Sequence, residues 1–453
     1  MEQHTQHEEN RPGPGSSRRL FLLASLTLLI LAGILGTIFA PRLWRHPSLL
    51  STRTVQGTFI PLWSDDHTVV LTKWGTTAYI WNLSTNTLTK GHPGGCVVQD
   101  NGLESSTGLY WICSYYDTGT ILVFDQLTGA QTVNYNDHRN HFWVNYTLSN
   151  DGTKAAFVSD QQVFQVWDLQ TGKIQLTLQL PPSSQPVAIA WSPDEQKLAV
   201  HYTGQGIEIW DLAEKRLSST LTGPDATDKG GELDWSSNSA RLGYAAETYE
   251  KTQVDIWEAS TGKLVLAHQS GPLFAGGLIQ LLAGGQSFLI TGENYDHFVL
   301  VSAATGRTLL DQTMPFMSSF QISPDTNLLE LANGKTIEIY DAFTGQKVAT
   351  YAGLVGGYSL GSTPVGTPSA MLGGWSPDSQ SIASAGQDAR LHVWNARTGQ
   401  DRTSYHLQMA FPSAVTWSQN GSMIAVSTST GNAGTPVSAL TSIQGIVSIV
   451  SAP

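Results

Sequence analysis

The sequence contains one stretch with the spacing of a nucleophilic serine site, GYSLG at residues 357–361. A serine hydrolase of this type needs the candidate nucleophile, here Ser359, on a sharp turn between a strand and a helix. The surrounding stretch, residues 348–374, is instead rich in Gly, Ser, Thr and Pro and shows no helical periodicity. We therefore expect an insertion between repeats here and no catalytic residue.

Two histidines that are three residues apart, His138 and His141, have a spacing found in some metal sites. Zinc usually takes three or four protein ligands. No cluster of carboxylates or cysteines accompanies these histidines, and the sequence has no EF-hand loop, P-loop or C-x-x-C motif. We expect neither a bound metal nor a cofactor.

The two cysteines, Cys96 and Cys113, lie on either side of the polar segment DNGLESSTG. If this segment is the turn of a hairpin, the cysteines face each other on its two arms. Directly opposite residues have Cα atoms about 4.5–5.5 Å apart, a distance that a disulfide can span. The sequence leaves two alternatives open, a disulfide or two buried thiols.

The segments that must position any site are repeats. FQVWDLQTGK, residues 164–173, is an alternating strand that ends in Trp-Asp and runs into a polar turn, and similar segments recur at intervals of 39 to 54 residues. A period near forty is typical of a supersecondary unit repeated in a propeller or similar array. Regular spacing favours packing roles for these aromatic residues and for Asp168 and Asp211. The equivalent positions are Trp81, Phe124, Trp167, Trp210, Trp257, Val301, Tyr340 and Trp394.

Each unit also has a hairpin upstream, such as AIAWSPDEQKLAV at residues 188–200, and a short strand downstream. Four antiparallel strands per unit predict an all-β fold, a single propeller over residues 55–453. Nine hairpins can be counted, but propellers typically have 4–8 blades, so the count is eight if the second unit (96–130) or the last is incomplete. The last unit lacks a fourth strand, which residues 50–56 could supply to close the ring.

These units resemble the WD-repeat β-propeller family. The most similar unit is SIASAGQDARLHVWNARTG, residues 381–399. The family pattern implies that Asp388 and Trp394 join a polar network with a histidine from a Gly-His pair, which this chain has only at residues 91–92. The resemblance implies a non-catalytic scaffold or sensor that binds an unidentified protein. The alternative is a propeller enzyme or small-ligand binder that uses the central channel, although no His, Asp, Glu or Arg recurs at equivalent positions to form such a site.

The N-terminus precedes the repeats. Residues 1–19 form a polar tail, residues 20–40 contain no charge, and residues 41–54 form a tether. A bilayer core needs about 20 apolar residues in a helix, so residues 20–40 predict a single membrane-spanning signal anchor. The short tail favours a cytoplasmic N-terminus with the propeller outside. SRRLFL, residues 17–22, resembles a twin-arginine export signal, and cleavage to an exported soluble protein is the alternative.

The charge of the chain excludes one class of partner. The net charge is −12, and beyond residue 46 there are 19 basic and 33 acidic residues, a net charge of −14. Such a field repels phosphate backbones. We therefore expect no nucleic-acid partner for the repeats.

Overall fold

The chain divides into two units, residues 1–46 and 47–453. The computed structural model describes residues of the second unit alone. The described ranges are 48–56, 59–73, 76–90, 102–104, 110–115, 120–125, 128–136, 145–158, 163–179, 186–202, 206–222, 231–247, 251–270, 279–292, 297–314, 319–332, 336–353, 373–385, 388–408, 411–429 and 444–453.

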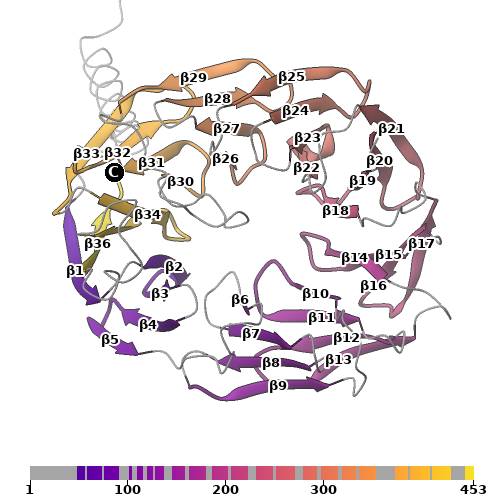
Figure 1. Cartoon of the computed structure of the whole chain (residues 1–453), viewed down its shortest axis with the longest axis horizontal. Helices are drawn as coiled ribbons and strands as arrows, with labels where there is room; N and C mark the ends of the chain where they lie inside the picture. Colours follow the sequence, from indigo (N-terminus) through magenta and orange to yellow (C-terminus); the bar gives the residue numbers. More distant parts are fainter. Residues whose placement is uncertain are drawn as a thin grey trace, which may run out of the picture. The chain divides into compact units, whose positions relative to one another are not determined.

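The second unit is a ring of nine four-stranded antiparallel sheets, the blades of a propeller (Figure 1). Apolar residues alternate along the strands, so each sheet buries side chains against both neighbours. Blade 1 contains β2 (Ile60–Asp65), β3 (Thr68–Lys73), β4 (Thr76–Asn82) and β5 (Thr87–Lys90); blade 2, β6 (Gly102–Glu104), β7 (Tyr110–Tyr115), β8 (Thr120–Asp125) and β9 (Gln131–Asn136); blade 3, β10 (Asn145–Leu148), β11 (Lys154–Val158), β12 (Val163–Asp168) and β13 (Ile174–Gln179).

The next three blades follow the same order, with the first strand innermost (Figure 1). Blade 4 contains β14 (Pro186–Trp191), β15 (Lys197–Tyr202), β16 (Gly206–Asp211) and β17 (Arg216–Leu221); blade 5, β18 (Gly231–Trp235), β19 (Arg241–Glu247), β20 (Thr252–Glu258) and β21 (Leu264–Ser270); blade 6, β22 (Ile279–Leu282), the 3-10 turn η1 (Ala283–Gly285), β23 (Ser287–Thr291), β24 (His297–Ser302) and β25 (Thr308–Thr313).

The last three blades include the point at which the ring closes. Blade 7 contains β26 (Ser319–Ile322), β27 (Leu328–Ala332), β28 (Ile337–Asp341) and β29 (Lys347–Tyr351); blade 8, β30 (Gly373–Trp375), β31 (Ser381–Ala385), β32 (Arg390–Asn395) and β33 (Asp401–His406); blade 9, β34 (Phe411–Trp417), β35 (Met423–Ser429), β36 (Gln444–Ser451) and β1 (Leu49–Gln56).

The ring is closed by its two ends. β1 pairs antiparallel with β36, from Leu49 opposite Val450 to Gln56 opposite Gln444. Residues 50–56, expected to complete the last blade, therefore lie in its outermost strand. The second and last units are both complete sheets, so the blade count is nine, and the alternative of eight is wrong.

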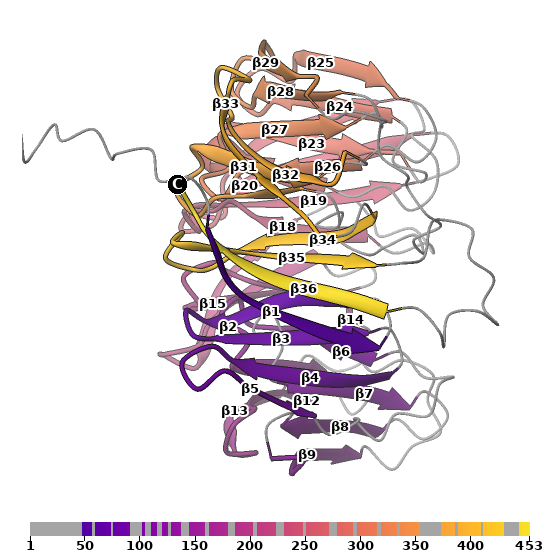
Figure 2. The same cartoon turned by 90° about the vertical axis from the view of Figure 1, so that its left-hand side faces the viewer.

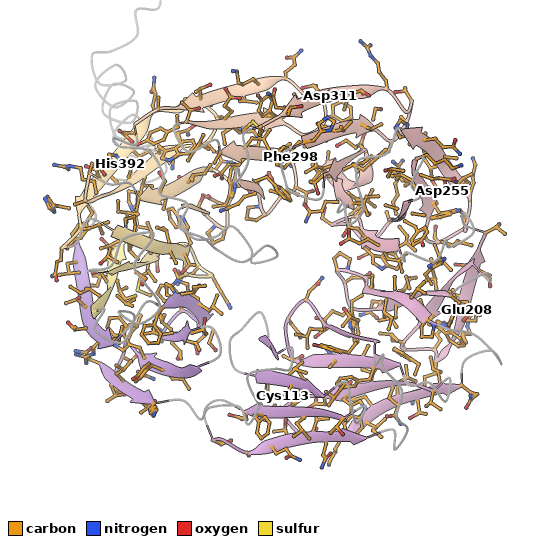
Figure 3. All side chains as sticks on the ribbon, viewed as in Figure 1. Cys113, Glu208, Asp255, Phe298, Asp311 and His392 are labelled. Carbon is orange, nitrogen blue, oxygen red and sulfur yellow. The ribbon has the colours of Figure 1, made fainter. Side chains whose placement is uncertain are left out.

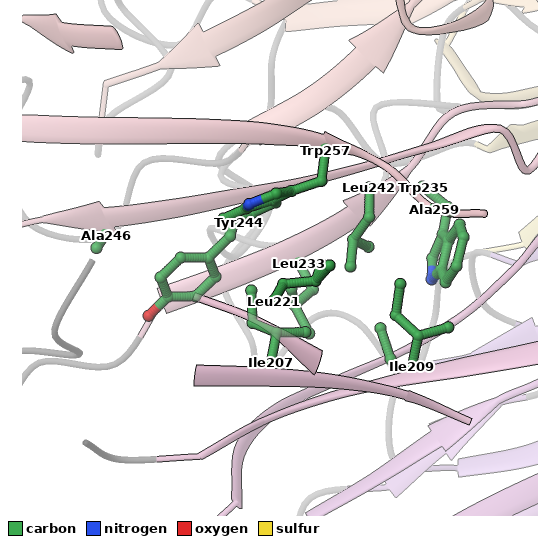
Figure 4. Packing of buried hydrophobic residues seen from close by; sticks show 11 residues of the cluster. Ile207, Ile209, Leu221, Leu233, Trp235, Leu242, Tyr244, Ala246, Trp257 and Ala259 are labelled. Atoms are coloured by element: carbon green, nitrogen blue, oxygen red, sulfur yellow. The ribbon is translucent and has the colours of Figure 1, made fainter. Parts of the chain in front are cut away.

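The core lies in the seams between blades. Between blades 4 and 5, for example, Ile207 and Ile209 of β16 pack with Leu233 and Trp235 of β18 (Figure 4). Comparable buried clusters join the neighbouring pairs, such as blades 3 and 4 and blades 6 and 7. The stability of the ring therefore depends on side chains that interlock between sheets rather than on one central core.

The two flat sides of the ring differ (Figure 2). On one side, which we call the turn face, turns join the first strand to the second and the third to the fourth, as at residues 192–196 and 212–215 of blade 4. On the opposite side, the loop face, the second and third strands and successive blades are connected. β1 begins and β36 ends at the turn face.

Within the ranges just given, no helix is long and apolar enough to cross a membrane. The expected anchor, residues 20–40, lies outside these ranges and stays a prediction.

Candidate functional site

The repeat aromatic residues are buried or half-buried, and several of their indoles donate hydrogen bonds. Trp81 and Trp394 have no exposed surface, and Trp257 is 2% exposed. The indole of Trp167 donates to Gln165 Oε1 at 3.1 Å, and that of Trp210 donates to Glu208 Oε2 at 3.1 Å (Figure 3 labels Glu208). These aromatic residues fill seams and have their polar atoms satisfied within the sheet, so they do not form a binding platform.

The acceptor two residues before the aromatic position is a feature that the sequence interpretation missed. In blade 7, the Tyr340 hydroxyl donates to Glu338 Oε2 at 2.6 Å. The signal is visible in the sequence as FQVW, IEIW and IEIY, in which a polar side chain stands at the same offset. Residues i and i+2 of a strand share a face, so the pair can bond without help from another strand.

Blade 8 places Asp388 and Trp394 in two separate hydrogen-bonded pairs, and not in one network with the histidine of a Gly-His pair as the family resemblance implies. His392 Nε2 lies 2.8 Å from Asp388 Oδ2, and the Trp394 indole donates to Ser384 Oγ at 3.0 Å. The histidine belongs to β32, the same strand as Trp394, and not to a Gly-His pair. Tyr351 of blade 7 stacks on Trp394 with ring centroids 4.5 Å apart, which ties this tryptophan to the seam between blades 7 and 8.

The aspartates after the tryptophans cap turns. Asp168 Oδ1 accepts the Thr171 N–H at 2.7 Å, and Asp211 Oδ1 accepts the Glu214 N–H at 2.8 Å. Burial opposes the charge of Asp168, but hydrogen bonds from Thr171 and its neighbours outweigh burial and lower its pKa. A carboxylate that is held in its own turn in this way has a structural role.

A tryptophan at the end of several innermost strands joins that strand to the preceding blade. The indole of Trp235 donates to the Ala190 carbonyl at 3.1 Å, and that of Trp191 donates to the Thr147 carbonyl at 3.3 Å. The same bond links Trp417 to the Gly374 carbonyl at 2.8 Å. In each case the accepting carbonyl belongs to the residue just before the position that corresponds to the tryptophan in the preceding blade, as Ala190 precedes Trp191.

The seam between blades 5 and 6 is built differently. Glu232 Oε2 accepts the Ile279 N–H at 2.9 Å, and Asp234 Oδ2 accepts the Leu281 N–H at 2.6 Å. Burial raises the pKa of Glu232 to about 7, and it raises the pKa of Asp234 to about 7 with a further contribution from the charge of Glu232. Two carboxylates thus connect β18 to β22, whereas the seams of Trp191, Trp235 and Trp417 use an indole.

Another desolvated carboxylate lies in blade 7. Glu330 of β27 is 4% exposed. Burial raises its pKa to about 8, and the nearby Trp375 indole offsets this only in part.

Within the described ranges, His, Cys, Asp and Glu side chains form no group of three that could hold a metal ion.

The remaining sequence candidates are resolved in part. Cys113 is fully buried in β7 and belongs to a disulfide. Gly102 of β6 lies opposite it, so the expectation that Cys96 lies directly opposite Cys113 is wrong: residues 102–104, expected in the turn, form the strand that pairs with β7. Cys96, the one other cysteine of the sequence, lies outside the described residues, and the pairing stays a prediction. Ser359, His138 and His141 also lie outside them.

One open cavity of about 430 Å³ lies beside the innermost strands. Trp63 of β2, Trp417 of β34 and Asp151 of the first turn of blade 3 contribute to its lining. The indole N–H groups of both tryptophans already donate to carbonyls of neighbouring blades. The lining therefore offers apolar ring surface, one carboxylate, and the amide side chains of Asn150 and Gln419.

Comparisons with known proteins agree with this architecture. No protein-family model matches the chain. It is similar to WD repeat-containing protein 1 of Xenopus tropicalis, 24% identical over 230 residues that are 49% of this chain and 35% of that protein. It is also similar to Cell division cycle 20.1, cofactor of APC complex, of Arabidopsis thaliana, 24% identical over 48% of this chain and 49% of that protein.

Among solved structures, the Dos1 propeller covers 89% of this chain with a TM-score of 0.50 and 11% identity, a likeness of fold alone. The relatives and the repeated units support a WD-repeat β-propeller. The chain spans about half the length, or less, of the curated relatives it matches. Their names therefore do not identify a partner for this propeller.

Proposed function

We propose that this WD-repeat propeller is a non-catalytic scaffold that displays a protein-binding surface, held at a membrane by residues 20–40. The observation that carries the proposal is the use of the repeat side chains. Indoles such as that of Trp235 join blades, and carboxylates such as that of Asp168 cap turns. The ring is thus a rigid support, and WD-repeat propellers typically use such a support to bind other proteins.

The finer part of the proposal concerns the membrane. Residues 20–40 contain no charged side chain and have the length of a spanning helix. We propose a single anchor with the N-terminus in the cytoplasm and the propeller outside. A protease-protection experiment on intact cells tests this orientation: digestion of the propeller before lysis agrees with it, and protection until lysis contradicts it.

The scaffold role is tested by affinity capture of the full chain from detergent-solubilised membranes, followed by identification of the bound proteins. A specific protein that is recovered with the wild type, and not with an unrelated membrane-anchored propeller as control, supports the scaffold. Recovery of no protein, combined with thermal stabilisation by a small molecule, contradicts it.

That second outcome corresponds to the alternative function, a small-ligand site in the channel. The cavity beside Trp63 and Trp417 is the observation that favours it. Its volume, about 430 Å³, lies within the range of small-molecule pockets. Trp417→Phe replaces the indole by a smaller ring and so removes part of the apolar wall, so a ligand that packs against Trp417 should lose affinity in this variant.

A further inference from the structure

Three blades form the walls of the cavity beside the innermost strands. Blade 9 contributes Thr416, Trp417 and Gln419, blade 1 contributes Trp63, and the first turn of blade 3 contributes Asp151. These residues stand near the ends of first strands or in the turns that follow them. The cavity, about 430 Å³ in volume, therefore lies at the mouth of the channel on the turn face.

The wall shared by blades 9 and 1 is fixed by hydrogen bonds between the two blades. The Trp63 indole donates to the Thr416 carbonyl at 3.3 Å, and the Thr416 hydroxyl donates to the Pro61 carbonyl at 3.1 Å. Gln419 Nε2 donates to the Ser64 carbonyl at 3.3 Å. This wall is thus in place before a ligand arrives, and a preorganised site lowers the entropic cost of binding.

Several donors of the lining are already used, whereas acceptors remain. Both indole N–H groups and the Thr416 hydroxyl donate to backbone carbonyls. Within the described part of the chain, Gln419 Oε1 accepts no hydrogen bond, and Asp151 Oδ2 accepts one, from the Thr153 hydroxyl at 2.8 Å. A carboxylate oxygen can accept a second. A ligand that donates hydrogen bonds therefore fits this lining better than one that only accepts them.

The charge at this mouth favours a cation. The first turns of blades 9, 1 and 3, with the strand residues next to them, carry the carboxylates of Asp65, Asp66 and Asp151, one imidazole, and one ammonium, that of Lys154. Lys154 Nζ lies 3.8 Å from Asp151 Oδ2 but 2.7 Å from Glu195 Oε2, so two carboxylates share this ammonium. Burial opposes the charge of Asp151, but hydrogen bonds within its own turn outweigh burial and lower its pKa to about 2. Negative charge therefore persists at the cavity at neutral pH.

The two indoles suit the same kind of ligand. A cation within about 6 Å of the centroid of a tryptophan ring is attracted by the negative charge on the ring face. Apolar ring surface also covers the carbon atoms that a cationic head group carries. By contrast, an anion would be repelled by the carboxylates, and an uncharged apolar ligand would bury the Asp151 carboxylate without a partner.

We propose that this cavity binds an organic cation that carries N–H donors, an alkylammonium or alkylguanidinium group, with the charged group at the Asp151 carboxylate and the carbon atoms against Trp63 and Trp417. The inference rests on the cavity that also supports the alternative function above, and it does not depend on the membrane anchor. The same cationic group occurs in free amines and in lysine and arginine side chains, and the experiment separates these two sources.

The test measures the binding of butylammonium to the full chain by ligand-observed NMR, with butan-1-ol as the uncharged analogue. Asp151→Asn removes the charge and fits the turn, because Asn238 and Asn420 accept the same bonds at the equivalent position of blades 5 and 9. The matched control is Asp194→Asn, the same change in the first turn of blade 4, outside the described lining. We expect butylammonium to bind at least about fivefold more tightly than butan-1-ol, Asp151→Asn to weaken it by about fivefold, and Asp194→Asn to leave it unchanged.

Two outcomes would overturn the inference at different levels. If butan-1-ol binds as tightly as butylammonium, or if Asp151→Asn and Asp194→Asn weaken butylammonium equally, the site does not select a cation, and the cavity is left for an uncharged ligand. If neither compound binds, the ligand site itself is wrong, and the scaffold role, which protein capture tests, is unaffected.

A blocked peptide identifies the source of the cation. The peptide is Gly-Gly-Lys-Gly-Gly, acetylated and amidated, and it is measured on the same three proteins. Binding at least as tight as that of butylammonium, weakened by Asp151→Asn and not by Asp194→Asn, assigns the site to a lysine side chain of a protein partner. Binding of butylammonium without binding of the peptide assigns it to a free amine.

Discussion

Two neighbouring seams of the ring use opposite chemistry. Between blades 4 and 5, the Trp235 indole donates to a backbone carbonyl, and the buried His201 ring contacts the Tyr244 ring at a tilt of 43°, with centroids 4.2 Å apart. Between blades 5 and 6, the Glu232 and Asp234 carboxylates accept backbone N–H groups. The first seam is held by neutral groups and the second by groups that can be charged.

The difference predicts opposite responses to pH. Burial lowers the pKa of His201 to about 4, so the first seam favours the neutral imidazole and is weakened as the pH falls. Burial raises the pKa of Glu232 and of Asp234 to about 7, so the second seam favours the neutral acids and is weakened as the pH rises. The repeat sets the geometry of a seam, and individual side chains set its electrostatics.

The largest expected effect is at the first seam. Trp235→Ala removes a side chain that is 5% exposed and packs between two blades. Large-to-small substitutions of this kind cost about 3–5 kcal/mol. Chemical denaturation at constant pH measures the loss, and Ile174→Ala at the exposed rim is the control that should change little. A loss below about 1 kcal/mol would show that this seam does not depend on Trp235.

The next effect sharpens the contrast at the second seam. Glu232→Gln with Asp234→Asn keeps an acceptor for each N–H and removes both charges. Because the native pKa values exceed the unfolded ones, the wild type loses stability as the pH rises from about 4 to about 7. The double variant should lack this loss and exceed the wild type by several kcal/mol at pH 8, with no gain near pH 4. If the two proteins show the same dependence of stability on pH, Glu232 and Asp234 do not titrate with raised pKa values in the folded protein.

The third effect has the opposite sign. His201→Phe replaces an imidazole whose native pKa, about 4, lies below the unfolded value. The wild type therefore loses stability as the pH falls from about 6.5 towards 4, whereas the variant does not. Relative to its own value at pH 7.5, the variant should retain about 2 kcal/mol more than the wild type at pH 4.5. Each protein is compared with itself at two pH values, so any pH-independent loss of stability caused by the Phe substitution cancels.

The smallest effect should be the same at both seams. Gly262 and Gly306 adopt φ values of +68°, and an added Cβ would meet a leucine methyl of the preceding blade at 3.2 Å and 3.4 Å, respectively. Each Gly→Ala substitution should cost about 1 kcal/mol, chiefly from backbone strain. Thermal unfolding of the two variants measures it. If the two costs differ by more than about 1 kcal/mol, the packing at the outer turns also differs between the two seams.

The sequence predicts the blades better than it predicts their contacts. Tryptophans at fixed spacing, such as Trp167 and Trp210, mark the third strands because such residues must fill every seam. The closing strand was predicted as well, since residues 50–56 read as a fourth strand without a blade of its own. The blade count stayed open because the weak repeat pattern of the second unit (96–130) and of the last unit did not show whether each was a complete sheet.

The electrostatics of the seams could not be predicted. Glu232 and Asp234 bond to amides 47 residues away, and nothing in their local sequence names those partners. Likewise, the position of Cys113 opposite Gly102 depends on a register that composition does not determine. By contrast, the acceptors two residues before the aromatic positions could have been found, since the offset is local and repeated.

The central claim is that the repeat residues hold the ring together and do not form its binding site. Trp235→Phe tests it most directly, because it keeps the ring in the seam and removes the indole bond to Ala190. Unfolding free energy and the set of proteins captured from membranes are measured on the same variant. We predict a loss of about 1 kcal/mol with the captured proteins unchanged. Unchanged stability together with a lost partner would contradict the account.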